Sequence, residues 1–164
     1  MKTLIFGYGI TGKAVETFFK VKSKDYLIYD DNENVTLDIK KELLFDESQI
    51  DLIDEIVISP GINPSHKQIK NFETKNIITD IDLFSREFQG KFIGVTGTNG
   101  KTTFVNLLTD FLISKGINAV ACGNVGVSPL SINFEDKDFA IVELSSFQLY
   151  YCLLYTSDAA DDRI

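Results

Sequence analysis

Short apolar runs alternate with amphipathic stretches along most of the chain. The runs are rich in Val, Ile and Phe, as in buried strands, and the stretches between them repeat apolar residues at helical spacing. Strand and helix in alternation predict parallel sheets and an α/β fold. Strands are expected at residues 3–6, 26–29, 55–58, 77–79, 92–96, 119–122 and 139–142, and helices at 12–20, 64–73, 80–88 and 102–115.

Two glycine-rich turns divide this pattern into two α/β units. A boundary is expected near residues 89–91, where a helix ends at a glycine and a new strand begins. Residues 1–89 predict a Rossmann-like parallel-sheet domain, and residues 90–151 predict the incomplete start of a P-loop ATPase α/β domain. A parallel sheet with so few strands exposes an apolar edge and face. Residues 90–151 are therefore expected to be poorly packed in isolation.

The last stretch, residues 152–164, does not continue the α/β pattern. It resembles a translated sequencing adaptor, so we expect it to be non-native and exclude it from fold reasoning. A genuine acidic tail is the alternative.

Composition narrows the classes of ligand. The chain has 164 residues, 44% of them hydrophobic, and 24 acidic against 16 basic residues give a net charge of −8. It shows no basic stripe for nucleic acid or an anionic membrane, so small anionic ligands are expected. The two cysteines form no disulfide framework or metal motif, and the N-terminus is not a signal sequence. We expect a cytoplasmic protein, and a monomer.

The first glycine turn, Gly7-Tyr8-Gly9-Ile10-Thr11-Gly12, follows a strand and opens a helix, with Asp30 at the end of the next strand. This pattern fits a dinucleotide fingerprint. The physics serves any nucleoside diphosphate, because glycines admit a pyrophosphate and a helix N-terminus stabilises its charge. The alternative is a turn that needs glycine for packing alone. Further on, Ser59-Pro60-Gly61-Ile62 turns at the same sheet edge, where Gly61 offers either a backbone amide or only a turn.

The second glycine turn is a variant P-loop. It runs Gly94-Val95-Thr96-Gly97-Thr98-Asn99-Gly100-Lys101-Thr102-Thr103 between a strand and a helix. Its amides predict an anion-binding nest, Lys101 can reach phosphates, and the Thr102 hydroxyl can bind Mg²⁺. The strict spacing would place glycine at Val95. The loop predicts ATP or GTP binding.

Two further clusters follow strands. Glu143 ends a strand expected near the P-loop, where its carboxylate could complete a Mg²⁺ shell. It precedes Leu144-Ser145-Ser146-Phe147-Gln148-Leu149. Asn124, within Gly123-Asn124-Val125-Gly126, could bind a ligand or only stabilise a turn.

In order and approximate spacing, these motifs resemble those of the Mur ligases over residues 1 to about 151. The Glu-Leu-Ser-Ser-Phe-Gln-Leu segment at 143–149 is most similar to the D-glutamate-adding branch. The resemblance implies phosphorylation of the carboxylate of UDP-N-acetylmuramoyl-L-alanine by ATP, then attack by the amine of D-glutamate on the acyl phosphate.

Site residues follow from the same resemblance. It implies that the UDP-sugar is held by Ile10, Thr11, Asp30, Gly61, Asn124 and Ser145, and ATP by Gly97, Thr98, Asn99, Gly100, Lys101, Thr102 and Thr103. Lys101 and Glu143 are the expected catalytic residues, with Thr102 and Glu143 as Mg²⁺ ligands, because phosphoryl transfer between anions requires charge compensation. Ser146 is a further candidate for substrate or metal contacts.

Some features depart from the family pattern. Asp31 stands where a neutral side chain would suit a uridine nucleotide better, and we leave it out of the site. His66, the single histidine of the sequence, is expected to be a solvated surface residue. The family's D-glutamate site and later catalytic residues have no counterpart before residue 151, so this chain alone is expected to be inactive.

Three other functions compete with the ligase. A nicotinamide-dependent oxidoreductase would explain the first glycine turn and Asp30 but not the Gly-Lys-Thr loop. A P-loop module or GTPase switch would explain Lys101 and Thr102 but not the first unit. A folate-type ligase would not need a UDP-binding unit in front.

Overall fold

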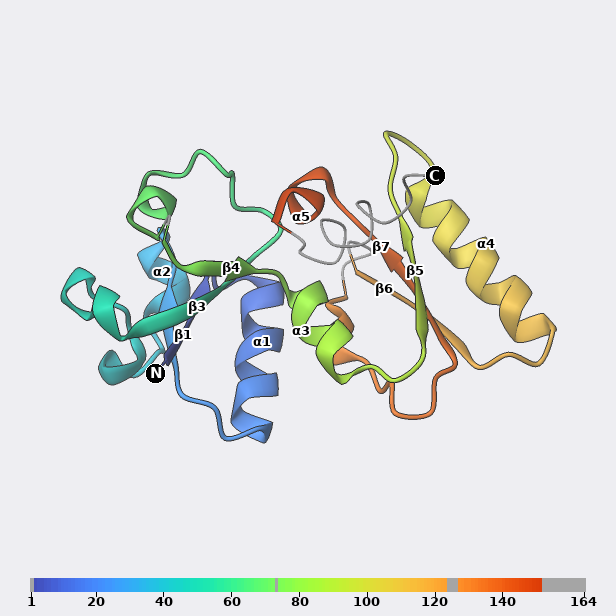
Figure 1. Ribbon diagram of the computed structural model, residues 1–164, viewed down its shortest axis with the longest axis horizontal. Coiled ribbons are helices and arrows are strands. Elements are labelled where there is room, and N and C mark those ends of the chain that lie inside the picture. Colours follow the sequence, from blue (N-terminus) through green and yellow to red (C-terminus); the bar gives the residue numbers. More distant parts are fainter. Residues whose placement is uncertain (1, 73, 124–126, 152–164) are drawn as a thin grey trace.

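Two parallel sheets lie beside each other in the computed structural model, which describes residues 2–72, 74–123 and 127–151 (Figure 1). The first sheet has four strands in the order β2-β1-β3-β4, and the second has three in the order β5-β7-β6. The predicted α/β class is confirmed, and each predicted strand forms with small shifts at its ends. The strands are β1 (Lys2–Phe6), β2 (Tyr26–Tyr29), β3 (Ile53–Ile58), β4 (Asn76–Ile78), β5 (Lys91–Val95), β6 (Ala119–Gly123) and β7 (Phe139–Glu143).

The α-helices are α1 (Ile10–Val21), α2 (Glu33–Thr36), α3 (Asp80–Glu87), α4 (Lys101–Ser114) and α5 (Ser146–Tyr151). The described residues also form the short 3₁₀ helices η1 (Lys41–Leu43), η2 (Glu47–Leu52), η3 (Lys67–Phe72) and η4 (Pro129–Ser131). Within the described ranges, none of the helices combines the length and apolarity that a membrane span requires.

The helix predicted at residues 64–73 forms in part, over Lys67–Phe72, and it is a 3₁₀ helix and not an α-helix. This helix is η3, and its two buried residues are Ile69 and Phe72. These residues lie three apart, and the three-residue turn of a 3₁₀ helix puts both on one face. The connection from β3 to β4 is thus anchored by the two apolar side chains of η3.

Both faces of the first sheet are covered by hydrophobic side chains. On one face, Val15 and Phe19 of α1 pack against the sheet. On the other, Ile69 and Phe72 of η3 pack against it. Alternate residues of a strand point to opposite faces, so β1 supplies Ile5 to one cluster and Leu4 and Phe6 to the other. The sheet is therefore buried on both sides, as parallel sheets usually are.

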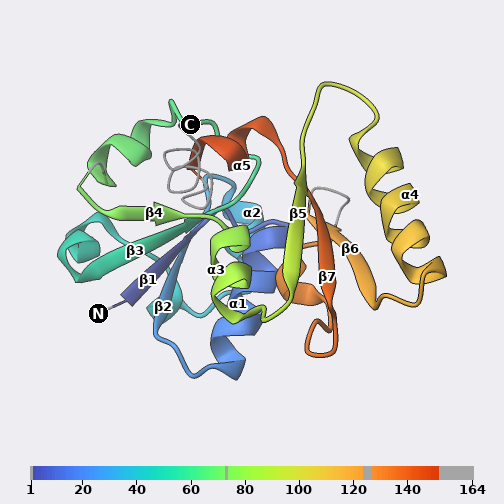
Figure 2. The same ribbon diagram turned by 45° about the vertical axis from the view of Figure 1, so that its right-hand side comes forward.

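Helix α3 lies between the two sheets (Figure 2). Its Leu83 belongs to the hydrophobic cluster of the first sheet. Its Ile81 and Phe84 belong to the cluster of the second sheet, with Val142 of β7 and Leu144 just after that strand. A capping box of Thr79 and Asp82 fixes where α3 begins. One short helix therefore contributes to both cores.

Helix α4 covers the other side of the second sheet with few residues. Val105 and Thr109 are its buried positions. Phe104, Leu107 and Phe111 are 55%, 64% and 56% exposed. An apolar stripe of α4 thus faces solvent in this chain, which fits the reasoning that residues 90–151 are incompletely packed.

Candidate functional site

The first glycine turn contains two glycines that the fold itself requires. Gly7 adopts a φ of +92°, a region that favours glycine, and a Cβ there would lie 2.9 Å from the Cβ of Ser59. The Ser59 hydroxyl donates a hydrogen bond of 2.8 Å to the Gly7 carbonyl. A Cβ on Gly12 would overlap that same carbonyl. Packing alone therefore explains Gly7 and Gly12.

Gly9 is different, because nothing in the fold fills the space where its side chain would be. A Cβ built there meets no atom within 4 Å, and Gly9 immediately precedes α1. Gly61 across the turn also has open space at its Cβ position. Bare backbone beside a helix N-terminus suits a ligand with diphosphate charge.

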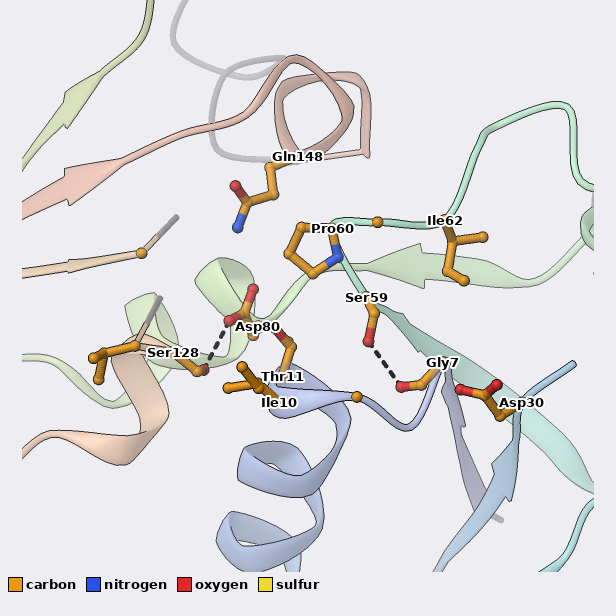
Figure 3. A pocket seen from close by; sticks show the side chains of 14 residues that line it. Gly7, Ile10, Thr11, Asp30, Ser59, Pro60, Ile62, Asp80, Ser128 and Gln148 are labelled. Carbon is orange, nitrogen blue, oxygen red and sulfur yellow. Dashed lines mark hydrogen bonds between the residues drawn. The ribbon is translucent and has the colours of Figure 1, made fainter. Parts of the chain in front are cut away.

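A cavity of about 410 Å³ opens over this turn, between the two sheets. We call it the inter-sheet cavity. Figure 3 shows residues from both halves of the chain around it. Its lining consists of Gly7, Gly9, Ile10, Thr11, Asp30, Ser59, Pro60, Gly61, Ile62, Asp80, Gly123, Val127, Ser128 and Gln148. The structure therefore brings Ile10, Thr11, Asp30 and Gly61 together around one cavity, and their binding of a UDP-sugar stays a prediction.

Asp30 is held firmly at one end of the cavity. Its Oδ2 accepts from the Tyr8 amide at 2.6 Å, and its Oδ1 accepts from the Asn32 amide at 2.8 Å. Both bonds orient the carboxylate at the carboxyl end of β2, where ligands of α/β sheets commonly bind.

The neighbouring Asp31 pairs with His66. The His66 Nε2 atom lies 2.5 Å from Asp31 Oδ2, and the Tyr29 hydroxyl donates to Asp31 Oδ1 at 2.7 Å. Hydrogen bonds from Tyr29 and then from His66 lower the pKa of Asp31. His66 also packs edge-on against Phe6. Its side chain is 21% exposed, so this surface histidine is partly shielded from solvent. The pair ties the chain after Gly61 to the end of β2.

The second glycine loop lies between β5 and α4. Gly97 and Gly100 have φ values of +150° and +76°, and a Cβ on Gly100 would meet open space. The Lys101 ammonium donates to the Gly97 carbonyl at 2.7 Å, so it lies back on its own loop. A separate hollow is lined by Asn99, Gly100 and Lys101 with residues of β5.

Thr102 and Glu143 meet at the base of this loop. Strands β5 and β7 pair with Val95 opposite Glu143, which brings the end of β7 to the start of α4. The Thr102 hydroxyl donates to Glu143 Oε2 at 2.6 Å, and Glu143 is buried. A hydroxyl and a carboxylate are hard oxygen donors that fit a Mg²⁺ ion shared with phosphate oxygens. In the described ranges, no group of three or more His, Cys, Asp or Glu side chains could hold a metal.

Asn124 and Ser145 are the two remaining predicted substrate residues. Asn124 lies outside the described residues. Ser145 is not among the residues that line the cavity. Its hydroxyl accepts from the backbone amide of Gln148 at 3.1 Å, and its own backbone amide donates to Gln148 Oε1 at 2.9 Å. This reciprocal pair caps α5. The role of Ser145 in binding stays a prediction.

The relatives found among curated proteins share one name. The chain is 39% identical over 156 residues to a UDP-N-acetylmuramoylalanine–D-glutamate ligase of Rickettsia prowazekii, covering 88% of this chain and 34% of that protein. Proteins of the same name from Rickettsia felis and Protochlamydia amoebophila are 40% and 37% identical over 95% and 90% of the chain, or 36% and 37% of their own lengths. The chain belongs to the Mur ligase family. It spans about a third of the length of these relatives. No protein-family model matches the chain.

Family membership agrees with the motifs, but the cavity contains residues that sequence reasoning missed. Gln148 stood within the quoted 143–149 segment, so a signal for it existed. Asp80 and Ser128 gave no such signal in the sequence. Asp80 directly follows the helix-capping Thr79, and Ser128 precedes a proline, so helix starts account for both residues. Only the approach of the two sheets places these residues in one wall.

Proposed function

We propose that this chain is part of an ATP-dependent ligase that joins D-glutamate to UDP-N-acetylmuramoyl-L-alanine in peptidoglycan precursor synthesis. The observation that carries the proposal is the inter-sheet cavity, which combines the bare turn at Gly9 with Gln148 of the segment most similar to the D-glutamate-adding branch. The curated relatives bear the name of that ligase.

The cavity would hold the UDP-sugar by its diphosphate. The first amides of α1 have no partners within the helix, and together with the helix dipole they favour negative charge beside Ile10 and Thr11. Asp30 would receive a polar group of the nucleoside, since its carboxylate is fixed in place at this end. The net charge of −8 does not oppose this, because the attraction is local.

The second glycine loop would hold ATP. Its amides point to phosphate oxygens in the proposed complex, and the Lys101 ammonium moves from the Gly97 carbonyl to the β- and γ-phosphates. Thr102 and Glu143 would hold Mg²⁺, which offsets phosphate charge in the transition state.

The proposed reaction has two steps. A carboxylate oxygen of the UDP-sugar substrate attacks the γ-phosphorus, an acyl phosphate forms, and ADP leaves. The amine of D-glutamate then attacks the acyl carbon, an amide bond forms, and phosphate leaves with loss of a proton from nitrogen. Lys101 stabilises the transferred phosphoryl charge in the first step. Use of ATP and a UDP-sugar agrees with a cytoplasmic reaction.

A thermal-shift titration of the 164-residue chain tests the substrate class. UDP-N-acetylmuramoyl-L-alanine should raise the unfolding midpoint, because a ligand that binds only the folded state stabilises it. NAD is the control and should leave the midpoint unchanged. Stabilisation by NAD and not by the UDP-sugar would overturn the proposal in favour of an oxidoreductase.

A further inference from the structure

Asp80 is a buried acid in the wall of the inter-sheet cavity, and it is not a member of the capping box of α3. It is the first residue of α3 and is 1% exposed. The preceding Thr79 and the following Asp82 already form the capping box of this helix. The capping box therefore does not account for the buried carboxyl group of Asp80.

The two oxygens of Asp80 have different surroundings. Oδ2 accepts a hydrogen bond of 2.8 Å from the Ser128 hydroxyl, which joins α3 to the segment before η4. Oδ1 is buried and has no hydrogen-bond partner in the described part of the chain. A buried polar atom without a partner is costly, and native structures seldom keep one without a reason.

The free oxygen faces the amide group of Gln148 across the cavity. Figure 3 shows it directed away from Ser128 and toward Gln148, with a gap between them. Gln148 Oε1 is occupied by the Ser145 amide, so its amide nitrogen faces the gap. A carboxyl oxygen and an amide nitrogen that face one space can accept from and donate to the same polar group of a ligand.

Asp80 and Asp30 lie on opposite sides of the first glycine turn. Asp30 follows β2 on the outer side of the turn, whereas Asp80 and Ser128 lie on the side of the second sheet (Figure 3). A ligand whose diphosphate rests on the N-terminus of α1, with its nucleoside at Asp30, would extend its other end toward Asp80.

We propose that Asp80 binds the sugar part of the nucleotide substrate, with Oδ1 accepting a hydrogen bond from a sugar hydroxyl or amide N–H that also contacts Gln148. The inference rests on the proposed function, since it assumes that the cavity binds a UDP-sugar. It adds a residue that recognises the sugar rather than the nucleoside diphosphate.

The energetics of Asp80 agree with this role. Burial raises the pKa of Asp80, whereas the Ser128 hydroxyl, the Gln148 side-chain amide and the backbone amides of Asp80 and Ile81 oppose that rise without cancelling it. A hydrogen-bond donor brought by the ligand would satisfy the free oxygen at the moment of binding. A nucleoside diphosphate without the sugar lacks this donor, so the contact with Asp80 favours the UDP-sugar over UDP.

The test compares two probes on the 164-residue chain, UDP-N-acetylmuramoyl-L-alanine and UDP, by isothermal titration. Asp80→Ala should weaken binding of the UDP-sugar about tenfold, as for the loss of one hydrogen bond to a charged group, and change UDP binding less than about twofold. Asp80→Asn should keep UDP-sugar binding within about threefold, because an amide can pair with Ser128 and with a hydroxyl.

Asp54→Ala is the matched control, because Asp54 Oδ2 is also a buried oxygen without a partner but Asp54 does not line the cavity. It should leave both affinities unchanged. Equal losses for both probes in Asp80→Ala, an unchanged ratio of affinities, or the same loss in Asp54→Ala would each overturn the role of Asp80. Failure of the unmodified chain to bind either probe would instead overturn the proposed function.

Discussion

Gly9 and Gly12 lie three residues apart in one turn, yet their surroundings are opposite. A Cβ on Gly12 would overlap the Gly7 carbonyl, whereas a Cβ on Gly9 would meet nothing within 4 Å. The fold explains the first glycine, and a ligand best explains the second. The same substitution, glycine to alanine, should therefore affect binding at Gly9 and stability at Gly12.

Gly9→Ala should abolish or strongly weaken binding of the UDP-sugar, by tenfold or more, because its methyl group enters the space above the turn. Stability should not fall, since replacing glycine where the backbone allows it stabilises by about 0.5 kcal/mol. Urea unfolding and titration calorimetry measure the two effects. Unchanged affinity would show that this face of the turn is not a binding surface.

Gly12→Ala is the companion variant and should lose stability by roughly 1–3 kcal/mol, because the added methyl group overpacks against backbone. Urea unfolding measures this. A fully stable Gly12→Ala would contradict the packing explanation for this glycine.

Glu16 joins two buried tyrosines. The hydroxyls of Tyr8 and Tyr26 donate to its carboxylate at 2.8 and 3.0 Å. Burial and then the hydrogen bond to Glu16 raise the pKa of Tyr26 to about 12. The pKa of Tyr8 rises for the same reasons. Burial acts to raise the pKa of Glu16, but hydrogen bonds from Tyr8, Lys20 and Tyr26 outweigh it and lower the pKa.

A pH dependence follows for Tyr26. Its pKa in the folded state lies above the unfolded value near 10, so its contribution to stability is complete below about pH 10 and is lost as pH rises toward 12. Glu16→Gln should make this alkaline loss shallower, since it removes the negative charge that opposes ionisation. Urea unfolding midpoints from pH 7 to 11.5 measure it. An equally steep alkaline loss in Glu16→Gln would contradict the assignment.

At the scale of elements, the pairing of β5 with β7 creates the contact between Thr102 and Glu143. The register sets Val95 opposite Glu143, and the loop between β5 and α4 returns Thr102 to the same edge. Two oxygen donors from distant parts of the chain thus meet beside the glycine loop. Their use as Mg²⁺ ligands is our proposal.

Glu143→Gln should weaken ATP binding about tenfold or more when Mg²⁺ is present and little when it is chelated, because the amide is a poorer ligand for this cation. The fold should persist, since a glutamine oxygen can still accept from Thr102. Calorimetric titration with ATP, with and without a chelator, gives the comparison. An equal loss in both conditions would argue against a metal role for Glu143.

Most helices and strands could be predicted from the sequence because short runs of neighbouring residues determine them. Apolar runs marked the seven strands, and glycine turns marked the starts of α1 and α4. η3 was mistaken for an α-helix, because the spacing of Ile69 and Phe72 fits either period over so short a segment. Asp80 was missed because its partner Ser128 lies 48 residues away, and only tertiary packing joins them.

At the scale of the whole molecule, α3 couples the sheets and α4 leaves an apolar stripe exposed. Ile81 and Phe84 bury one face of the second sheet from the side of the first. Phe104, Leu107 and Phe111 on α4 stay more than half exposed. The domain division near residues 89–91 remains a proposal. In it, α3 contributes side chains to the hydrophobic clusters of both sheets.

Amide hydrogen exchange should differ between the two sheets. Amides of α4 and β5 are expected to exchange faster than those of β1 and β3. The reason is that a hydrophobic cluster covers each face of the first sheet. Mass spectrometry of peptides from both units measures this. Equally slow exchange in residues 90–151 would refute the prediction of poor packing there.

The central claim is that the inter-sheet cavity binds the UDP-sugar and the second glycine loop binds ATP. Amide chemical-shift mapping by NMR on the 164-residue chain tests it most directly, because each ligand reports its own location. The account predicts that UDP-N-acetylmuramoyl-L-alanine shifts the amides of Ile10, Thr11 and Gly61, and that ATP with Mg²⁺ shifts those of residues 97–103. Shifts caused by the UDP-sugar at residues 97–103 alone, or none in the cavity, would contradict it.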